Sequence, residues 1–202
     1  MMKLAQLISI IGHPLFMPSY AFGLLISFNP YINMMISDST KKILFIILFL
    51  FTIVLPVLTA VTMKQFKLID SIFMRNAEER KWPFTFTLIW YYIALQLISK
   101  MYIPQSFLLL MVGAISVIGV AIIITLRWKV SIHMLGIGGV VGAIIGISQR
   151  FQFDHSPLII GLIFMAGLIG YARLKTNSHS YQQVYTGFLL GFVVEWAFIL
   201  YF

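Results

Sequence analysis

Long apolar stretches, separated by short polar loops, make up most of the chain. Seven stretches have the length of a membrane-spanning helix, which needs about 20 apolar residues, with a range of roughly 17–25. Because an open sheet cannot satisfy its backbone hydrogen bonds in lipid, the pattern predicts an all-α fold, a polytopic membrane helical bundle with six to seven transmembrane helices. The predicted spans are residues 4–28, 43–63, 84–101, 104–126, 132–148, 156–172 and 183–202.

Prolines and glycines modify this picture at particular positions. His13-Pro14 and Pro18 interrupt the first apolar stretch, so we expect a short surface helix followed by a short span. Pro56 predicts a kink in the second span, because proline removes a helical hydrogen bond. The fifth and seventh spans carry glycines four residues apart, a spacing that lets helix backbones approach closely. These glycines are Gly138, Gly142 and Gly146 in the fifth span and Gly187 and Gly191 in the seventh.

Composition narrows the class of protein. Of the 202 residues, 60% are hydrophobic and only 10% are charged, whereas a soluble domain has about 25% charged residues. We therefore expect one integral membrane domain over residues 1–202, multi-pass and located in the bacterial inner membrane. The chain has no cysteine, which excludes disulfides and thiolate metal sites. Its net charge of +8 is scattered along the sequence, which favours contact with the headgroups of the lipid bilayer over nucleic-acid binding.

Alternating the spans between the two sides of the membrane brings three basic loops, residues 64–83, 127–131 and 173–182, to one face. With Lys3, this face holds ten Lys and Arg residues, against four on the other. The positive-inside rule would place the basic face in the cytoplasm. Five of the ten are candidate anion ligands, and without them the count is five against four, so charge leaves the orientation open. These five are Arg75, Arg80, Lys81, Lys129 and Arg173.

Two short clusters on this face combine basic residues with a histidine: residues 129–133 and residues 173–179. Ionisable residues at membrane-helix ends are costly to desolvate and are by default candidates for a functional role. Arginine offers a planar fork that suits phosphate oxygens. One imidazole could attack phosphorus while a second protonates the leaving oxygen. The clusters therefore indicate phosphoryl transfer in which arginines stabilise charge without a metal ion or another cofactor.

Local patterns place the two histidines. Ser131 is the expected N-cap of the fifth span, which puts His133 in the first helical turn. His179 and Gln183 are four residues apart and share a helix face if the seventh span begins before them.

The spacing of these residues resembles the type 2 phosphatidic acid phosphatases, or lipid phosphate phosphatases. Their third motif, Ser-Arg, five residues, His, three residues, Asp, matches Ala172-Arg173, five residues, His179, three residues, Gln183. Their second motif, Pro-Ser-Gly-His, matches residues 130–133 as Val-Ser-Ile-His. The first motif, Lys, six residues, Arg-Pro, is represented by Arg75, six residues and Trp82-Pro83. The resemblance extends over about 110 residues and implies a phosphatase-like core at about 64–202, preceded by N-terminal helices in residues 1–63.

The resemblance also implies a role for each site residue. His179 would be the nucleophile that forms a phosphohistidine, His133 the acid for the leaving group, and Gln183 the partner that orients His179. The phosphate would be bound by Arg173, with help from Arg75, Arg80, Lys81, Lys129 and Ser131. The implied substrates are a phospholipid or a polyprenyl phosphate, including phosphatidate, phosphatidylglycerol phosphate and polyprenyl pyrophosphate.

Two departures from the family pattern support a second hypothesis. Gln183 replaces an aspartate and brings no charge to His179, and Ile132 replaces the glycine of the second motif. In serine proteases, replacing the corresponding Asp with Asn lowers turnover by about 10⁴. The alternative is thus a catalytically degenerate protein that binds a lipid headgroup or a membrane-protein partner in an envelope complex. A small transporter or channel is a third hypothesis, disfavoured because the polar residues gather at one face.

Two further residues are interpreted structurally. His13 beside Pro14 is expected to break a helix and not to be a ligand. Glu195, an acid deep in the seventh span, is expected to make a buried hydrogen bond between helices.

Overall fold

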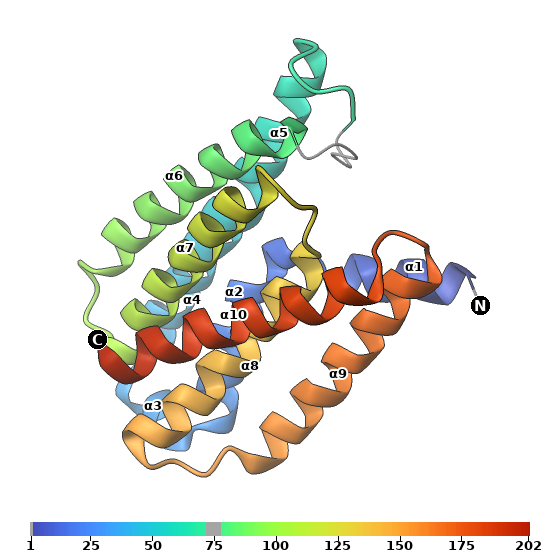
Figure 1. Ribbon diagram of the computed structural model, residues 1–202. Helices are drawn as coiled ribbons and strands as arrows, with labels where there is room; N and C mark the ends of the chain where they lie inside the picture. Colours follow the sequence, from blue (N-terminus) through green and yellow to red (C-terminus); the bar gives the residue numbers. More distant parts are fainter. Residues whose placement is uncertain (1, 72–77) are drawn as a thin grey trace.

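A computed structural model describes residues 2–71 and 78–202, and every element in these residues is helical. Six helical stretches are long and apolar enough to cross a membrane, which confirms the predicted all-α, multi-pass class (Figure 1). The elements are α1 Met2–Ile11, η1 Pro14–Phe16, α2 Met17–Phe28, α3 Pro30–Met35, α4 Asp38–Leu48, η2 Phe49–Val54, α5 Leu55–Gln65, η3 Glu78–Arg80, α6 Lys81–Ile98, α7 Gln105–Thr125, α8 Ile132–Phe151, α9 Ser156–Lys175 and α10 Tyr181–Tyr201.

The predicted third span, residues 84–101, corresponds to α6, which begins three residues earlier and packs against α5 and α7. This helix is not among the six apolar stretches. Its 18 residues include a lysine, a glutamine and a proline, which lower its mean hydropathy. It nevertheless lies beside α5 and α7 in Figure 1 and connects the basic end of the bundle to the opposite end.

The helical geometry changes near the prolines of the first and second apolar stretches. The first apolar stretch breaks into α1 and α2, with the short 3₁₀ helix η1 between them. The helix of residues 38–65 widens into the π-helical turn η2 directly before Pro56. Proline cannot donate to the carbonyl four residues earlier, and its ring crowds that carbonyl, so the wider turn accommodates both effects.

Helices α8 and α10 form the closest pair in the bundle, as the glycine spacing predicts. A Cβ added to Gly138 or Gly142 would collide with the carbonyl oxygens of Phe188 and Phe192 on α10. Gly191 faces α8 in the same way, where an added Cβ would meet the Leu135 carbonyl oxygen. In the absence of a hydrophobic force within lipid, such backbone proximity supplies the van der Waals contact that holds two membrane helices together.

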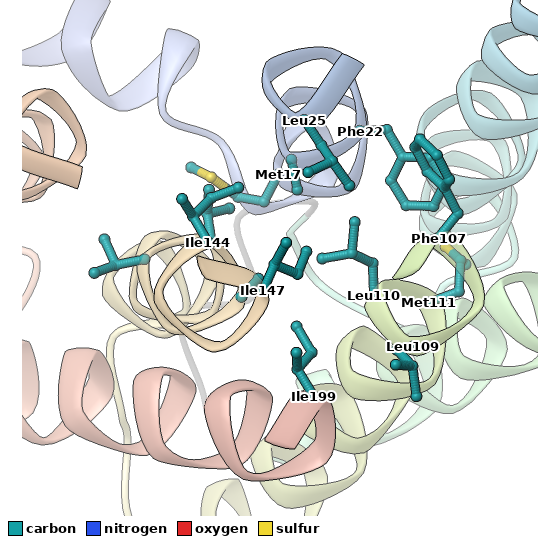
Figure 2. Close-up of a cluster of buried hydrophobic side chains, with 14 of the residues drawn as sticks. Met17, Phe22, Leu25, Phe107, Leu109, Leu110, Met111, Ile144, Ile147 and Ile199 are labelled. Atoms are coloured by element: carbon teal, nitrogen blue, oxygen red, sulfur yellow. The ribbon is translucent and has the colours of Figure 1, made fainter. Parts of the chain in front are cut away.

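The apolar core extends along much of the length of the bundle. Side chains from α2, α7, α8 and α10 meet there, and Figure 2 shows Phe22 and Leu25 facing the α7 residues Phe107 and Leu110. Ile199 from α10 is fully buried in the same cluster. A cavity opens beside this core and reaches the end of the bundle where the basic loops meet.

Candidate functional site

The turn between α9 and α10 sets the distance from Arg173 to His179. Helix α9 ends in a Schellman motif: the Ser178 N–H donates to the Arg173 carbonyl at 3.1 Å, and the Asn177 N–H donates to the Leu174 carbonyl at 3.0 Å. Asn177 adopts a left-handed conformation with φ of 50°, which asparagine tolerates better than most residues. The chain thereby reverses and returns His179 to the end of α9 that carries Arg173.

Gln183 contacts His179, although not through a shared helix face. Helix α10 begins at Tyr181, after His179, so the two residues do not share a helix face. Gln183 instead folds back in a capping box with Ser180, whose N–H donates to Gln183 Oε1 at 3.1 Å. The same oxygen lies 3.1 Å from His179 Nδ1.

These contacts determine which nitrogen of neutral His179 carries the proton. The Ser180 N–H is a donor, so the Gln183 atom that it meets must be the amide oxygen. An oxygen that only accepts requires a proton on His179 Nδ1, which leaves the lone pair on Nε2. In the neutral ring, Nε2 of His179 is therefore the nitrogen with an available lone pair.

The second cluster is tied directly to the first. The Ser131 N–H donates to the Gln183 carbonyl at 3.2 Å, so α8 and α10 begin at the same level of the bundle. Ser131 is the N-cap of α8 and His133 lies in the first turn, as predicted. The Ser131 side chain makes no capping hydrogen bond, and its hydroxyl is fully buried without a partner in the described structure.

His133 is held by the N-terminal helix. Its Nε2 lies 3.1 Å from the carbonyl oxygen of Ser9. The His13 N–H, which would normally bond to that carbonyl, turns to Ile10 instead as α1 ends. Since a carbonyl only accepts, His133 Nε2 carries a proton. In the neutral ring, Nδ1 therefore has the lone pair that can accept or release a second proton.

Arg173 is a half-buried cation with an incomplete set of partners. Its Nη1 donates to the Ser9 hydroxyl at 3.4 Å. Its Nε is buried and has no hydrogen-bond partner among the described residues, and Arg173 makes no ion pair with them. A buried guanidinium N–H without an acceptor is costly, so this position favours an anionic ligand.

Two further cations lie close to Arg173. Arg80, on η3, is 7% exposed and donates to the Val130 carbonyl at 3.4 Å. Burial lowers the pKa of Arg80, and burial together with the charges of Arg80 and Arg173 lowers the pKa of Lys129. The loop before α6 and the loop before α8 thus meet beside the α9–α10 turn, which supports the predicted convergence of the three basic loops.

His179 is neutral at physiological pH in this environment. Burial, followed by the charge of Arg173, lowers the pKa of His179 to about 4, while the hydrogen bond to Gln183 acts in the opposite direction. Its ordinary value is about 6.5. The Nε2 lone pair is therefore available over the whole physiological range.

A cavity of about 1220 Å³ runs from these residues into the apolar part of the bundle. Its polar end is lined by Arg80, Lys129, His133, Arg173 and His179. Its walls are apolar side chains of α2, α5, α6, α7 and α8, and Glu195 of α10 lines its inner part. This shape could accept a charged headgroup at one end and a hydrocarbon chain along the rest.

Several sequence candidates do not line this cavity. Lys81 is exposed, with its amine 5.6 Å from the centre of the Trp82 ring. Ser131 contributes its backbone but lies outside the lining. Arg75 lies outside the described residues.

Two residues that the sequence did not indicate also belong to this cluster: one lies in α1 and the other directly follows that helix. Ser9 contacts both His133 and Arg173, and the His13 ring lies 5.3 Å from the His133 ring, in an edge-to-face arrangement. His13 does break the helix, as expected, but it also lines the cavity. The available signal was a histidine inside an apolar stretch, at the point where prolines interrupt that stretch.

Glu195 differs from its expected role. It is 4% exposed, and no hydrogen bond joins it to another described residue. Its carboxyl group packs against Gly113 of α7, where an added Cβ would lie 2.5 Å away.

No family model, characterised protein or solved structure matches this chain. Within the described ranges, no group of three His, Cys, Asp or Glu side chains is placed to hold a metal ion. The family resemblance of the motifs therefore stays a prediction.

Proposed function

We propose that the protein is a metal-independent lipid phosphate or pyrophosphate phosphatase that acts through a phosphohistidine at the membrane surface. The observation that carries the proposal is the Arg173 guanidinium, whose buried Nε has no acceptor in the described structure, beside a histidine with a free Nε2. A phosphate group would supply acceptors to Arg173 and an electrophile to His179.

The geometry suggests a two-step reaction. The Nε2 lone pair of His179 attacks phosphorus, and the bond from phosphorus to the ester oxygen breaks with its electron pair on that oxygen. Protonated His133 transfers its Nδ1 proton to this oxygen, while its Nε2–H stays bonded to the Ser9 carbonyl. Water then attacks phosphorus, the P–N bond returns its pair to His179, and His133 takes the proton of the water.

Arg173 and Lys129 support this chemistry electrostatically. They lie at the polar end of the cavity, where their charges would stabilise the phosphoryl oxygens as the leaving-group bond breaks. A bound phosphate dianion also favours the protonated form of His133 that the first step needs.

The apolar walls of the cavity favour a lipid over a soluble phosphate ester. A ligand with its phosphate at Arg173 would have its chain surrounded by residues of α2, α6, α7 and α8. Phosphatidate, phosphatidylglycerol phosphate and polyprenyl pyrophosphate all have this form. We place the protein in the bacterial inner membrane as part of the same proposal.

The test is phosphate release from these three lipids by the purified protein in mixed micelles. We expect release by the wild type and a loss of at least about 10²-fold in the His179→Ala variant, because removing a nucleophile eliminates the covalent step. Tyr181→Ala, at a neighbouring exposed position, is the matched control and should retain activity. Equal, negligible release by the wild type and His179→Ala would refute the enzymatic proposal.

One observation favours the second candidate, a phosphatase-like protein that binds a lipid headgroup or an assembly partner. Gln183 Oε1 is shared between His179 and the Ser180 N–H and carries no charge, so it stabilises an imidazolium less than a carboxylate would. This candidate predicts an inert protein that still retains anionic lipid, or copurifies with a membrane protein.

The cavity gives little support to a transporter. Its described lining extends from the basic end to mid-helix residues such as Phe22, Ala143 and Glu195, and includes none of the loop residues 29–37 or 99–104 at the opposite end.

A further inference from the structure

His13 lines the cavity, although neither the motifs nor the composition of the chain gave it a role in the site. It lies between α1 and η1, where its backbone conformation begins the short helix and Pro14 fixes the next residue. Its ring meets the ring of His133 at 5.3 Å, and both line the cavity with Arg173 and His179. Three imidazoles from three separate segments thus line the cavity that also holds Arg173.

The contacts of His13 determine its hydrogen-bonding role. The Leu15 N–H donates to His13 Nδ1 at 3.4 Å, as in an N-cap. Nδ1 is therefore the acceptor nitrogen, and in the neutral ring the proton is on Nε2. No described residue accepts a hydrogen bond from Nε2, and Nε2 is not among the buried atoms that lack a partner.

We propose that His13 is a third phosphate-binding histidine, which donates its Nε2–H to a phosphoryl oxygen. The inference rests on the proposed function, since the ligand is the same phosphate ester. A neutral donor suits this position because Arg80, Lys129 and Arg173 already repel one another. His13 adds a hydrogen bond to the ligand without adding a further cation that would destabilise the empty site.

Three substitutions separate this role from helix capping. His13→Phe removes both functions, His13→Asn keeps a capping acceptor but is too short to replace Nε2–H, and His13→Gln offers a donor near Nε2. Each variant is assayed for kcat/KM of lipid phosphate release, and for inorganic phosphate binding to the detergent-solubilised protein by calorimetry.

We expect His13→Phe and His13→Asn to lose roughly 10–100-fold in kcat/KM and in phosphate affinity, the range of a hydrogen bond to a charged group. His13→Gln should recover a large part of both. The acidic limb of the kcat/KM profile of His13→Gln should lie at the same pH as in the wild type. A residue that donates a hydrogen bond in its neutral form does not set that limb.

The opposite ranking, with His13→Asn close to wild type and His13→Gln as defective as His13→Phe, would overturn the inference in favour of capping. If the wild type binds phosphate with this dependence on residue 13 but releases none from lipids, the enzymatic proposal fails and His13 remains a ligand. If the wild type neither binds phosphate nor releases it from lipids, both proposals fail.

Discussion

Replacement of Gln183 by glutamate tests the link between the capping box and the chemistry of His179. Glutamate has the same length and is also a capping-box residue, so the bond from the Ser180 N–H should persist. The carboxylate would lie where Gln183 Oε1 now lies, 3.1 Å from His179 Nδ1. The substitution therefore adds one negative charge to the partner of His179 and changes little else.

The size of the effect follows from the geometry. An opposite charge within about 4–6 Å changes a pKa by roughly 1–3. His179 is only half-buried, so solvent screens part of this effect, and we expect an increase of about 1–2. The pKa of His179, about 4 in the wild type, should rise to between about 5 and 6.

The assay is a pH titration of isotope-labelled histidine by NMR, with the His179 signal assigned from a His179→Gln variant. Gln182→Glu is the matched control, because it adds the same charge at an adjacent, exposed position that does not face His179. If the proposed function is correct, the lower limb of the kcat/KM profile moves upward with the pKa. Turnover also rises, by roughly tenfold or more, because the carboxylate stabilises the imidazolium.

The reasoning would be refuted if Gln183→Glu and Gln182→Glu gave the same His179 titration midpoint. That result would mean that Gln183 does not contact Nδ1. A shifted midpoint with no phosphate release at any pH would instead support the orienting contact and the non-catalytic candidate.

Three other predictions concern stability and charge. Gly191→Ala should destabilise the protein by about 1–3 kcal/mol in thermal unfolding, because the added Cβ meets the Leu135 carbonyl. The control, Gly161→Ala, has open space around the added Cβ and should have little effect. Equal melting temperatures of the two variants would contradict the packing argument. Because the pKa of His179 is lowered in the folded protein, the contribution of neutral His179 to stability is fully present above about pH 6.5 and is lost as the pH falls toward 4. The loss of stability with falling pH should therefore be less steep in His179→Gln. Lys129→Ala should raise the melting temperature in phosphate-free buffer, because burial and then the charges of Arg80 and Arg173 lower the pKa of Lys129. The same change should weaken phosphate binding roughly two- to fivefold. A lower melting temperature would indicate a structural role.

The sequence placed the two clusters on one face, and the structure has them at one end of the bundle. The sequence did not predict how their side chains make contact. His179 and Gln183 were expected to meet on one face of a helix. They meet because Gln183 caps the helix and turns its amide oxygen back. A spacing of four residues is compatible with both arrangements, and the position of the helix start distinguishes them.

Ser9 and His13 illustrate what a local pattern cannot predict. They lie more than a hundred residues before His133 and Arg173, and nothing in their immediate sequence relates them to either. Their contribution depends on how the end of α1 lies against α8 and α9, which leaves the Ser9 carbonyl open to His133.

The sequence by itself determined the membrane class, the all-α fold and the two clusters beside helix ends, because the length and polarity of each stretch are properties of local chain segments. The tertiary structure alone decided which cations reach the cavity, which nitrogen of each histidine carries its proton, and that the N-terminal segment completes the site. Those outcomes depend on individual hydrogen bonds between distant segments, and a one-residue change in where a helix begins or ends would alter them.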